Sequence, residues 1–224
     1  MAWSAVIISF IYRIRITEMA KVGLINYGSG NFMSVFNALK YLNIDVIEVR
    51  VPAQLDNTTH IILPGVGAFN ALVTKLEALG FVEGLEKHVV TYGKAYLGIC
   101  VGMQILATLG TEFQDSSGLD YIHGKILKIP AEKYDLRLPH IGWNEVVQEK
   151  ECPLFSDIDN SASFYFAHSY HFVPNDKDSL VAICCYGENV TACIAKDNCY
   201  GVQFHPEKSQ NNGLKLLENF IKVS

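Results

Sequence analysis

The amino-acid sequence predicts an α/β fold: one domain with a mostly parallel central sheet flanked by helices, plus an antiparallel extension of the same sheet. In the first half of the chain, short and nearly continuous apolar stretches alternate with amphipathic ones, which is typical of parallel strands joined by helices. From residue 122 onward, strand-like stretches follow one another with short turns, which favours antiparallel pairing. The 224 residues, of which 50% are apolar and 18% charged, suffice for one large core.

The first half of the chain supplies the expected parallel strands and their helices. Strands are predicted at residues 22–27, 46–51, 60–63 and 95–99, and helices over residues 32–42, 68–79 and 82–92. The first helix carries apolar side chains on one face, at helical spacing: Phe32, Val35, Phe36, Leu39 and Leu42. In the second half, strands are predicted at residues 122–129, 144–148, 163–173, 180–186, 190–196 and 200–204, and a closing helix over residues 212–223.

Composition and charge argue against several classes of function. The formal net charge is -5, which argues against a nucleic-acid-binding surface. The apolar run over residues 5–12 is too short to cross a bilayer, and basic residues follow it, so neither a membrane span nor a signal peptide is expected. We interpret residues 1–18 as an N-terminal extension of doubtful function before a single domain over residues 19–224. The six cysteines form no Cys-x-x-Cys pair, which favours free thiols in a reducing cytoplasm.

A candidate nucleophile lies where the strand predicted at residues 95–99 passes into a helix. The letters G-I-C-V-G match the sharp turn of a nucleophile elbow, with Cys100 in the nucleophile position. Glycine is expected at 98 and 102 because side chains there would clash with the turn. The turn would raise the Cys100 sulfur above the sheet edge at the positive end of the following helix, which favours thiolate. The alternative is a buried structural cysteine at a glycine-rich strand end.

A candidate base and its orienting carboxylate follow near the end of the chain. The strand predicted at residues 200–204 would deliver His205 to the sheet edge, and Pro206 would shape the turn after it. Glu207 can accept a hydrogen bond from the imidazole nitrogen that faces away from the thiol, which sets the tautomer and stabilises an imidazolium. Alone, a His-Pro-Glu segment is more often a solvated loop. Together with the elbow, it predicts a Cys-His-Glu triad.

A glycine-rich loop, P-G-V-G over residues 64–67, ends an earlier strand of the same sheet. Attack of a thiolate on an amide needs donors for the developing oxyanion, and the Val101 amide is one candidate. The loop can supply the second donor, since glycine lets its peptide turn toward or away from the site at modest cost. Considered alone, the loop is better explained as a tight turn between a strand and a helix.

These segments resemble the class I, or triad-type, glutamine amidotransferases. The elbow G-I-C-V-G-M-Q, the P-G-V-G loop and the H-P-E-K-S ending carry the likeness. Within that family, N-Y-G-S-G-N, P-G-V-G-A-F, H-I-G-W-N, A-H-S-Y and F-H-P-E-K-S are similar to the glutaminase subunits of imidazole glycerol phosphate synthases. The likeness covers residues 21–224. It departs mildly at Ile141 and Ala167, where the family more often has Met and Val, and clearly at residues 1–18.

The resemblance implies a role for each residue that matches a family motif. Cys100 would be the nucleophile, His205 the general base and then acid, and Glu207 its orienting partner. The oxyanion site would comprise Gly65, Val66 and Val101. The pocket for L-glutamine would comprise Gly67, Gln104, Glu112, Ser169 and Tyr170. The surface for the partner subunit would comprise Asn31, Trp143, Tyr165 and Lys208, although Trp143 is equally compatible with a core position.

The resemblance also implies a partner and a reaction. The partner would be a (β/α)8-barrel cyclase subunit, joined in a heterodimer, that uses the ammonia to make imidazole glycerol phosphate and aminoimidazole carboxamide ribotide in histidine biosynthesis. No metal, organic cofactor, nucleic acid or membrane is implied. Two alternatives stay open: the same glutaminase could serve a paralogous synthase, for example a sugar amidotransferase, or the chain could be a catalytically silent scaffolding subunit. The neighbouring genes would show which synthase accepts the ammonia. A glutaminase assay in the presence of the partner would show whether the chain is catalytically silent.

Overall fold

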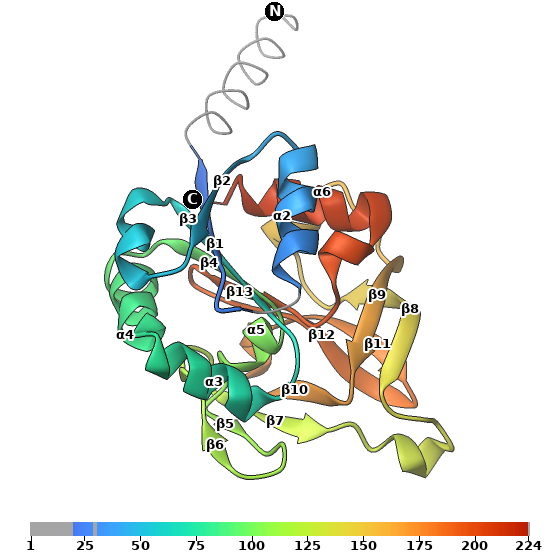
Figure 1. Ribbon diagram of the computed structural model, residues 1–224. Coiled ribbons are helices and arrows are strands. Elements are labelled where there is room, and N and C mark those ends of the chain that lie inside the picture. Colours follow the sequence, from blue (N-terminus) through green and yellow to red (C-terminus); the bar gives the residue numbers. More distant parts are fainter. Residues whose placement is uncertain (1–19, 29–30, 224) are drawn as a thin grey trace, which may run out of the picture.

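The fold is built around one long mixed sheet with helices on both of its faces (Figure 1). The structure is a computed structural model that describes residues 20–28 and 31–223. The interpretation of residues 1–18 as an extension therefore concerns a segment outside the described residues. The sheet has the strand order β2-β1-β3-β4-β13-β12-β11-β8-β9, so its two halves come from the two halves of the chain, apart from β13.

The parallel half of this sheet contains the strands predicted from the apolar runs. Its members are β1 (Lys21–Ile25), β2 (Asp45–Val49), β3 (His60–Gly65), β4 (Ala95–Cys100) and β13 (Cys199–Val202). Every residue of β3, β4 and β13 is buried, as expected for strands covered on both faces. The strand predicted at residues 200–204 thus joins the parallel half rather than the antiparallel extension.

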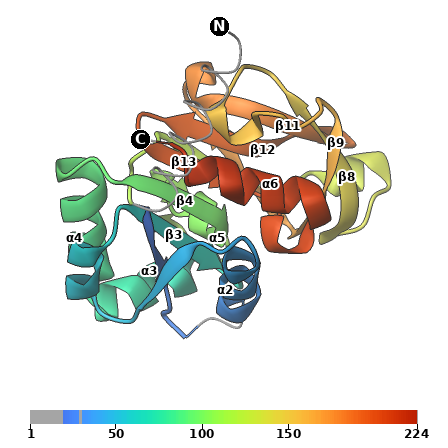
Figure 2. The same ribbon diagram turned by 90° about the horizontal axis from the view of Figure 1, so that it is seen from above.

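Helices cover both faces of the parallel strands (Figures 1 and 2). On one face lie α2 (Phe32–Tyr41) and α6 (Gln210–Phe220), and on the other α3 (Phe69–Ala78) and α4 (Phe81–Leu85). The predicted apolar face of α2 is confirmed, since Phe32, Val35 and Leu39 are buried. The helix predicted over residues 82–92 changes type, because α4 continues as a π-helix over Glu86–Thr91.

The antiparallel extension holds fewer strands than expected. It comprises β12 (Glu188–Lys196), β11 (Leu180–Tyr186), β8 (His140–Gln148) and β9 (Ala162–His168). A separate small sheet, in the order β10-β7-β5-β6, comprises β10 (Tyr170–Pro174), β7 (Gly124–Lys128), β5 (Leu109–Gly110) and β6 (Ser116–Ser117). The strand predicted at residues 122–129 therefore forms, but in this second sheet.

The single strand predicted over residues 163–173 is wrong. The chain leaves the large sheet after His168 and enters the small one at Tyr170. At the break, the Ser169 carbonyl accepts a hydrogen bond from the amide of Ile129 (3.0 Å). Burial alternates along β9 up to His168 and loses this alternation after the break, where Ser169 and Tyr170 are both half-buried and His171 and Phe172 are both buried.

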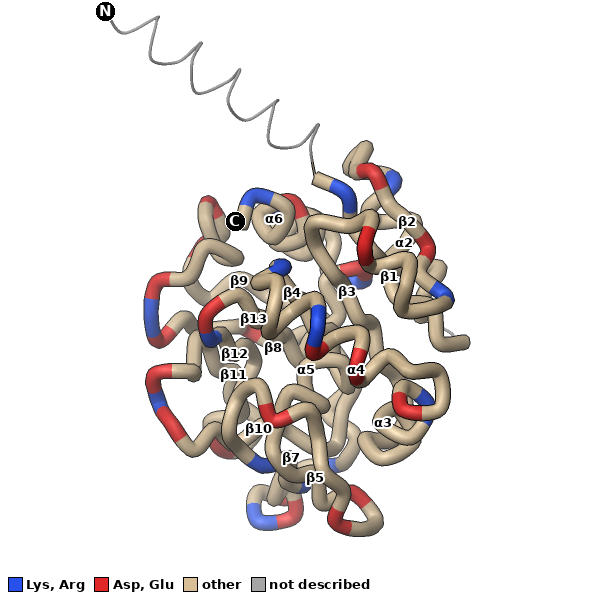
Figure 3. Tube along the Cα trace, turned by 90° about the vertical axis from the view of Figure 1, so that its left-hand side faces the viewer, with Lys and Arg blue, Asp and Glu red and all other residues tan. Residues whose placement is uncertain are grey.

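Short 3-10 turns complete the connections, at Pro52–Asn57, Ala131–Tyr134, Pro153–Phe155, Lys177–Ser179 and Pro206–Lys208. Basic and acidic residues alternate along the outer segments of the chain (Figure 3). In the part of the chain that the structure describes, no helix is long and apolar enough to cross a membrane.

The ends of β3, β4 and β13 meet at one edge of the sheet, where Gly65 is the register partner of Cys100.

Candidate active site

The elbow at the end of β4 holds Cys100 in an uncommon backbone conformation. Cys100 has φ 54° and ψ -112°, a region that non-glycine residues rarely occupy and that is retained mainly at functional sites. A Cβ on Gly98 would lie 2.2 Å from the Gly102 carbonyl oxygen, and one on Gly102 would lie 2.0 Å from that of Leu63. The steric reason predicted for the two glycines is therefore confirmed.

The helix after the elbow is short. It is α5 and spans only Val101–Gln104, so its dipole is small. Most of the stabilisation of a Cys100 thiolate must then come from side chains that reach the sulfur.

The structure brings His205 and Glu207 together beside Cys100. The Nδ1 atom of His205 donates to Oε1 of Glu207 at 2.8 Å, and the two side chains are 3% and 0% exposed. Burial lowers the pKa of His205, but hydrogen bonds with the Cys100 thiol and with Glu207 raise it more, to about 10. The imidazole is therefore charged near neutral pH, as a thiolate–imidazolium pair requires.

Asn31, to which the resemblance gives a partner-facing role, lies buried beside the triad. It is 6% exposed, and its Nδ2 donates to Oε1 of Glu207 at 2.9 Å. Oε1 of Glu207, the oxygen that binds His205, is thus also bound by Asn31, so both residues orient the carboxylate through one oxygen. This contact comes from the segment before α2, far from Glu207 in sequence, so spacing could not reveal it.

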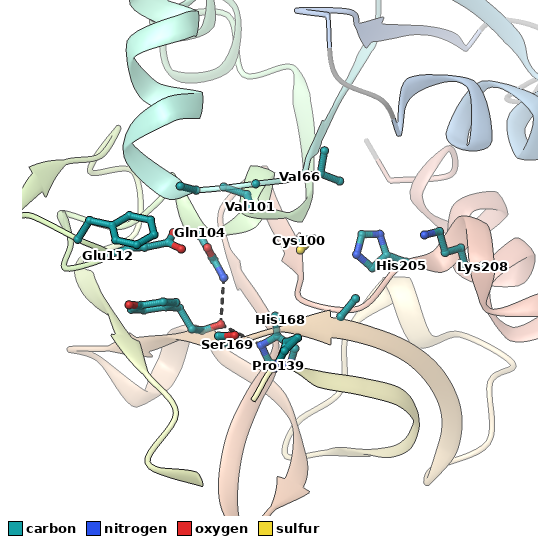
Figure 4. Close-up of a pocket in the computed structure, with 15 residues that line it drawn as sticks. Val66, Cys100, Val101, Gln104, Glu112, Pro139, His168, Ser169, His205 and Lys208 are labelled. Carbon is teal, nitrogen blue, oxygen red and sulfur yellow. Dashed lines mark hydrogen bonds between the residues drawn. The ribbon is translucent and has the colours of Figure 1, made fainter. Parts of the chain in front are cut away.

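Cys100 and His205 line a cavity of about 530 Å³ (Figure 4). All five residues expected to bind glutamine line it: Gly67, Gln104, Glu112, Ser169 and Tyr170. Glu112 also accepts a hydrogen bond from the backbone amide of Phe69, the first residue of α3, through Oε2 (2.9 Å). The cavity therefore offers a carboxylate, a carboxamide and two hydroxyl-bearing residues around one thiol.

The two expected oxyanion donors are placed differently. Val101 lines the cavity at the start of α5, next to the sulfur. The Val66 amide instead donates to the hydroxyl of Tyr27 at 3.4 Å. Gly65 packs against the elbow, since a Cβ there would lie 2.4 Å from the Gly102 nitrogen.

Three of the residues expected at the partner surface form one cluster, which reaches the cavity through Lys208. Trp143 on β8 is 48% exposed, which rules out the alternative of a core position. Its ring contacts that of Tyr165, its register partner on β9, with centroids 6.2 Å apart. The Nζ atom of Lys208 lies 5.7 Å from the centre of the Tyr165 ring, and Lys208 also lines the cavity.

Two residues of the site carried no prediction. Gln203 is fully buried, and its Nε2 donates to Sγ of Cys100 at 3.6 Å. His168 lines the cavity and donates through Nδ1 to the Tyr170 carbonyl at 2.9 Å. The signal for Gln203 was its position between Val202 and Phe204 in an apolar strand, because a polar residue buried there requires a partner.

Comparison with known proteins places this site in a family. Residues 23–223 match the model of the family described as glutamine amidotransferase class-I. The chain is 42% identical over 206 residues to the imidazole glycerol phosphate synthase subunit HisH of Pelagibacter ubique, covering 90% of this chain and 99% of the relative. It is 43% identical over 201 residues to the protein of the same name from Desulfitobacterium hafniense, covering 90% and 93%.

Solved structures agree at the level of fold. A putative GMP synthase subunit from Thermoplasma acidophilum is 21% identical, with a TM-score of 0.68 over 91% of this chain and 93% of that one. A structure described as a glutamine amidotransferase is 20% identical, with a TM-score of 0.70 over 90% and 99%. Together with the strained Cys100 and the His205–Glu207 pair, these likenesses assign the chain to the class-I glutamine amidotransferases, in the branch of the imidazole glycerol phosphate synthase subunits HisH.

Proposed function

We propose that this chain hydrolyses L-glutamine to glutamate and ammonia through Cys100, His205 and Glu207, and passes the ammonia to a (β/α)8-barrel cyclase subunit. The observation that carries the proposal is the His205–Glu207 hydrogen bond of 2.8 Å beside the strained Cys100, where Cys100 and His205 line a cavity large enough for an amino acid. This is the arrangement that nucleophilic catalysis by a thiol requires.

The reaction proceeds in two halves. The Cys100 thiolate attacks the side-chain amide carbonyl of glutamine, and a C–S bond forms as the carbonyl oxygen becomes an oxyanion. The His205 imidazolium gives its proton to the departing nitrogen, so the C–N bond breaks and ammonia leaves behind a thioester. His205, now neutral, takes a proton from water as the water attacks the thioester, and glutamate is released with the thiolate–imidazolium pair restored.

The cavity residues suit the two ends of the substrate. The Gln104 carboxamide and the Glu112 carboxylate can bind the α-ammonium group, and Ser169 and Tyr170 can bind the α-carboxylate. The Val101 amide serves as one oxyanion donor. The Val66 amide supplies the second once the peptide between Gly65 and Val66 turns away from Tyr27, since each such donor contributes on the order of a hundredfold in rate.

The partner is the cyclase subunit of an imidazole glycerol phosphate synthase in the histidine pathway. The proposal is supported by the names of the relatives reported above, which favour this acceptor over a sugar or other paralogous synthase. The cluster of Trp143, Tyr165 and Lys208 offers the docking surface, because it combines the exposed Trp143 ring, the half-buried Tyr165 ring and a cation, Lys208, that also lines the cavity. The intact triad argues against a silent scaffold. The expected location of the complex is the cytoplasm.

The decisive experiment replaces the nucleophile. In the complex with the cyclase, Cys100→Ala should abolish release of glutamate from glutamine, while synthesis from free ammonia at raised pH continues. Cys199→Ala is the matched control, since this buried thiol lies in β13 away from the cavity and its loss should leave both activities intact. Glutamine hydrolysis at a near-normal rate by Cys100→Ala would refute the triad.

A further inference from the structure

Gln203 is a buried carboxamide that ends at the sulfur of Cys100. It follows β13, and its backbone amide donates to the Ala192 carbonyl at 2.9 Å, which ties it to β12. Its side chain is fully buried, and its Nε2 lies 3.6 Å from Sγ. Burying a carboxamide in an apolar interior costs free energy unless its polar atoms are hydrogen-bonded. The Gln203 amide is therefore expected to have a hydrogen-bond partner at each end, and one of these partners is the Cys100 sulfur.

The hydrogen-bond network decides which end of the Gln203 amide faces the sulfur. The Tyr170 carbonyl can only accept, so it binds the nitrogen of Gln104 (3.0 Å). The same Gln104 nitrogen donates to Oε1 of Gln203 (3.0 Å). Gln203 must then present its NH₂ group to Cys100, and a donor at that position favours thiolate over thiol.

A chain of two buried histidines leads to the Tyr170 carbonyl, and its inner member, His168, lies in the cavity shown in Figure 4. His168 donates to this carbonyl through Nδ1, so Nε2 of His168 accepts from Nδ1 of His140 at 3.1 Å. Burial lowers the pKa of His168 to about 3 and that of His140 to about 4, so both rings are neutral near pH 7, as this chain of donors and acceptors requires. The chain of hydrogen bonds runs from His140 through His168, the Tyr170 carbonyl and Gln104 to Gln203. The donor and the acceptor of each of these bonds are therefore fixed.

We propose that Gln203 is a further catalytic residue: its side-chain NH₂ group holds the Cys100 sulfur and stabilises the thiolate, with Gln104 fixing its orientation. The inference rests on the proposed role of Cys100 as nucleophile. It also explains how a four-residue helix suffices at the elbow, because the buried amide supplies stabilisation that the short α5 cannot. Gln104 then has two functions, one toward the substrate through its carbonyl oxygen and one toward Gln203 through its nitrogen.

The test measures the thiolate directly, on the full-length chain. Gln203→Met keeps the length of the side chain and removes the donor, and Gln203→Glu replaces the donor by an acceptor. The rate of Cys100 alkylation by iodoacetamide is followed against pH by mass spectrometry of the Cys100 peptide. A hydrogen bond to a charged group contributes about 1.5 kcal/mol, so the alkylation midpoint should shift upward by about one pH unit in Gln203→Met and by more in Gln203→Glu.

A matched control separates this effect from loosened packing. Asn219→Leu also replaces a buried carboxamide by an apolar side chain, but Asn219 binds the carbonyls of Leu154 and Ser156 in another part of the core. It should lose stability without moving the alkylation midpoint. Steady-state kinetics add a second contrast: Gln203→Met should lower kcat about tenfold at unchanged KM, whereas Gln104→Met should also raise KM.

The outcomes are distinct. An unchanged midpoint in folded Gln203→Met and Gln203→Glu would overturn the inference and leave the triad standing, and so would an equal shift in Asn219→Leu. If Gln203→Met does not fold, Gln203→Glu decides, because it keeps a polar side chain of the same size at position 203, and Gln104→Met adds a second test, because it removes the group that orients the Gln203 amide. Failure of the triad itself would appear separately, as glutamine hydrolysis by Cys100→Ala.

Discussion

At the scale of single residues, the site depends on how a few buried polar groups share their hydrogen bonds. Oε1 of Glu207 accepts hydrogen bonds from both His205 and Asn31, and the His205 imidazole also forms a hydrogen bond with the Cys100 thiol. This arrangement favours the charged form of His205 although the ring is almost fully buried. The active site is therefore an ion pair assembled inside the protein, and its protonation state is linked to folding.

The pH dependence of stability should report this linkage. The pKa of His205 is raised from 6.5 to about 10 in the folded chain, so its contribution to stability is fully present below about 6.5 and is lost as pH rises through about 10. Glu207→Gln removes one cause of the shift. We therefore expect the free energy of unfolding of the wild type to exceed that of Glu207→Gln by more at pH 7 than at pH 10.

Urea unfolding of the two proteins at both pH values provides the measurement. Glutamine hydrolysis by Glu207→Gln should fall about a hundredfold or more, because the imidazole loses the group that orients it. A constant difference in stability between pH 7 and pH 10 would show that Glu207 does not control the titration of His205.

At the scale of elements, two backbone segments meet so closely that only glycine fits between them. The turn after β4 contacts the end of β3, where the Leu63 carbonyl would lie 2.0 Å from a Cβ at position 102. Backbone atoms on both sides cannot move aside independently, because both strands belong to the central sheet. The position of Cys100 is thus set by packing between two strand ends.

Gly102→Ala should separate those strand ends. We expect a loss of about 3 kcal/mol in the free energy of unfolding and loss of glutaminase activity. Gly93→Ala is the control: Gly93 has φ 68° with no atom within 4 Å of its added Cβ, so only backbone strain of about 1 kcal/mol is expected, with activity retained. Equal losses of stability and activity in both variants would show that the close contact with Leu63 does not determine the position of Cys100.

The loop over residues 64–67 should act as a switch. In the structure the Val66 amide donates to the Tyr27 hydroxyl, so it does not serve the oxyanion. We expect the isolated chain to be nearly inactive and the complex with ligand in the cyclase barrel to be fully active. Glutamate release is measured for the free chain, the complex, and the complex with an acceptor analogue; equal rates would contradict a switch.

Tyr27→Phe tests the contact that holds the inactive orientation. The substitution removes the acceptor but keeps the ring, so the amide can turn toward the cavity more easily. The isolated variant should release glutamate several-fold faster than the isolated wild type. This gain is only part of the increase, on the order of a hundredfold, that a fully formed oxyanion donor provides. In the fully activated complex the two proteins should have the same rate.

At the scale of the whole molecule, topology brings together segments that are distant in sequence. Parallel pairing of β3, β4 and β13 collects the glycine-rich loop, the nucleophile and the base at one sheet edge. The break after β9 then places Ser169 and Tyr170 in the same cavity, and Lys208, which also lines it, lies over the Tyr165 ring that contacts Trp143. The proposed partner surface therefore adjoins the cavity through Lys208.

Deletion of residues 1–18 tests where the functional unit begins. The described fold has a complete sheet from β1 (Lys21–Ile25) onward, and every residue assigned a role follows that strand. We expect the shortened chain to match the full chain in soluble yield, in thermal stability and in glutaminase activity with the cyclase. A clearly less active complex would mean that the extension contacts the site or the partner.

The sequence by itself determined the elements and the chemistry that depend on local spacing. The strands around Cys100 and His205, the two glycines of the elbow and the α2 apolar face were predictable, because each follows from a short period or a tight turn within a few residues. The order of thiol, imidazole and carboxylate at strand ends was sufficient to propose a triad.

Only the tertiary structure decided which buried groups contact one another. The burial of Asn31 against Glu207, the donation from Gln203 to Cys100 and the contact of Val66 with Tyr27 each join residues from different elements. The break at Ser169 likewise depends on two sheets competing for one apolar stretch. The physical reason is common to all four: a hydrogen-bond partner is chosen by position and direction in space, and neither is encoded in the alternation of apolar and polar residues.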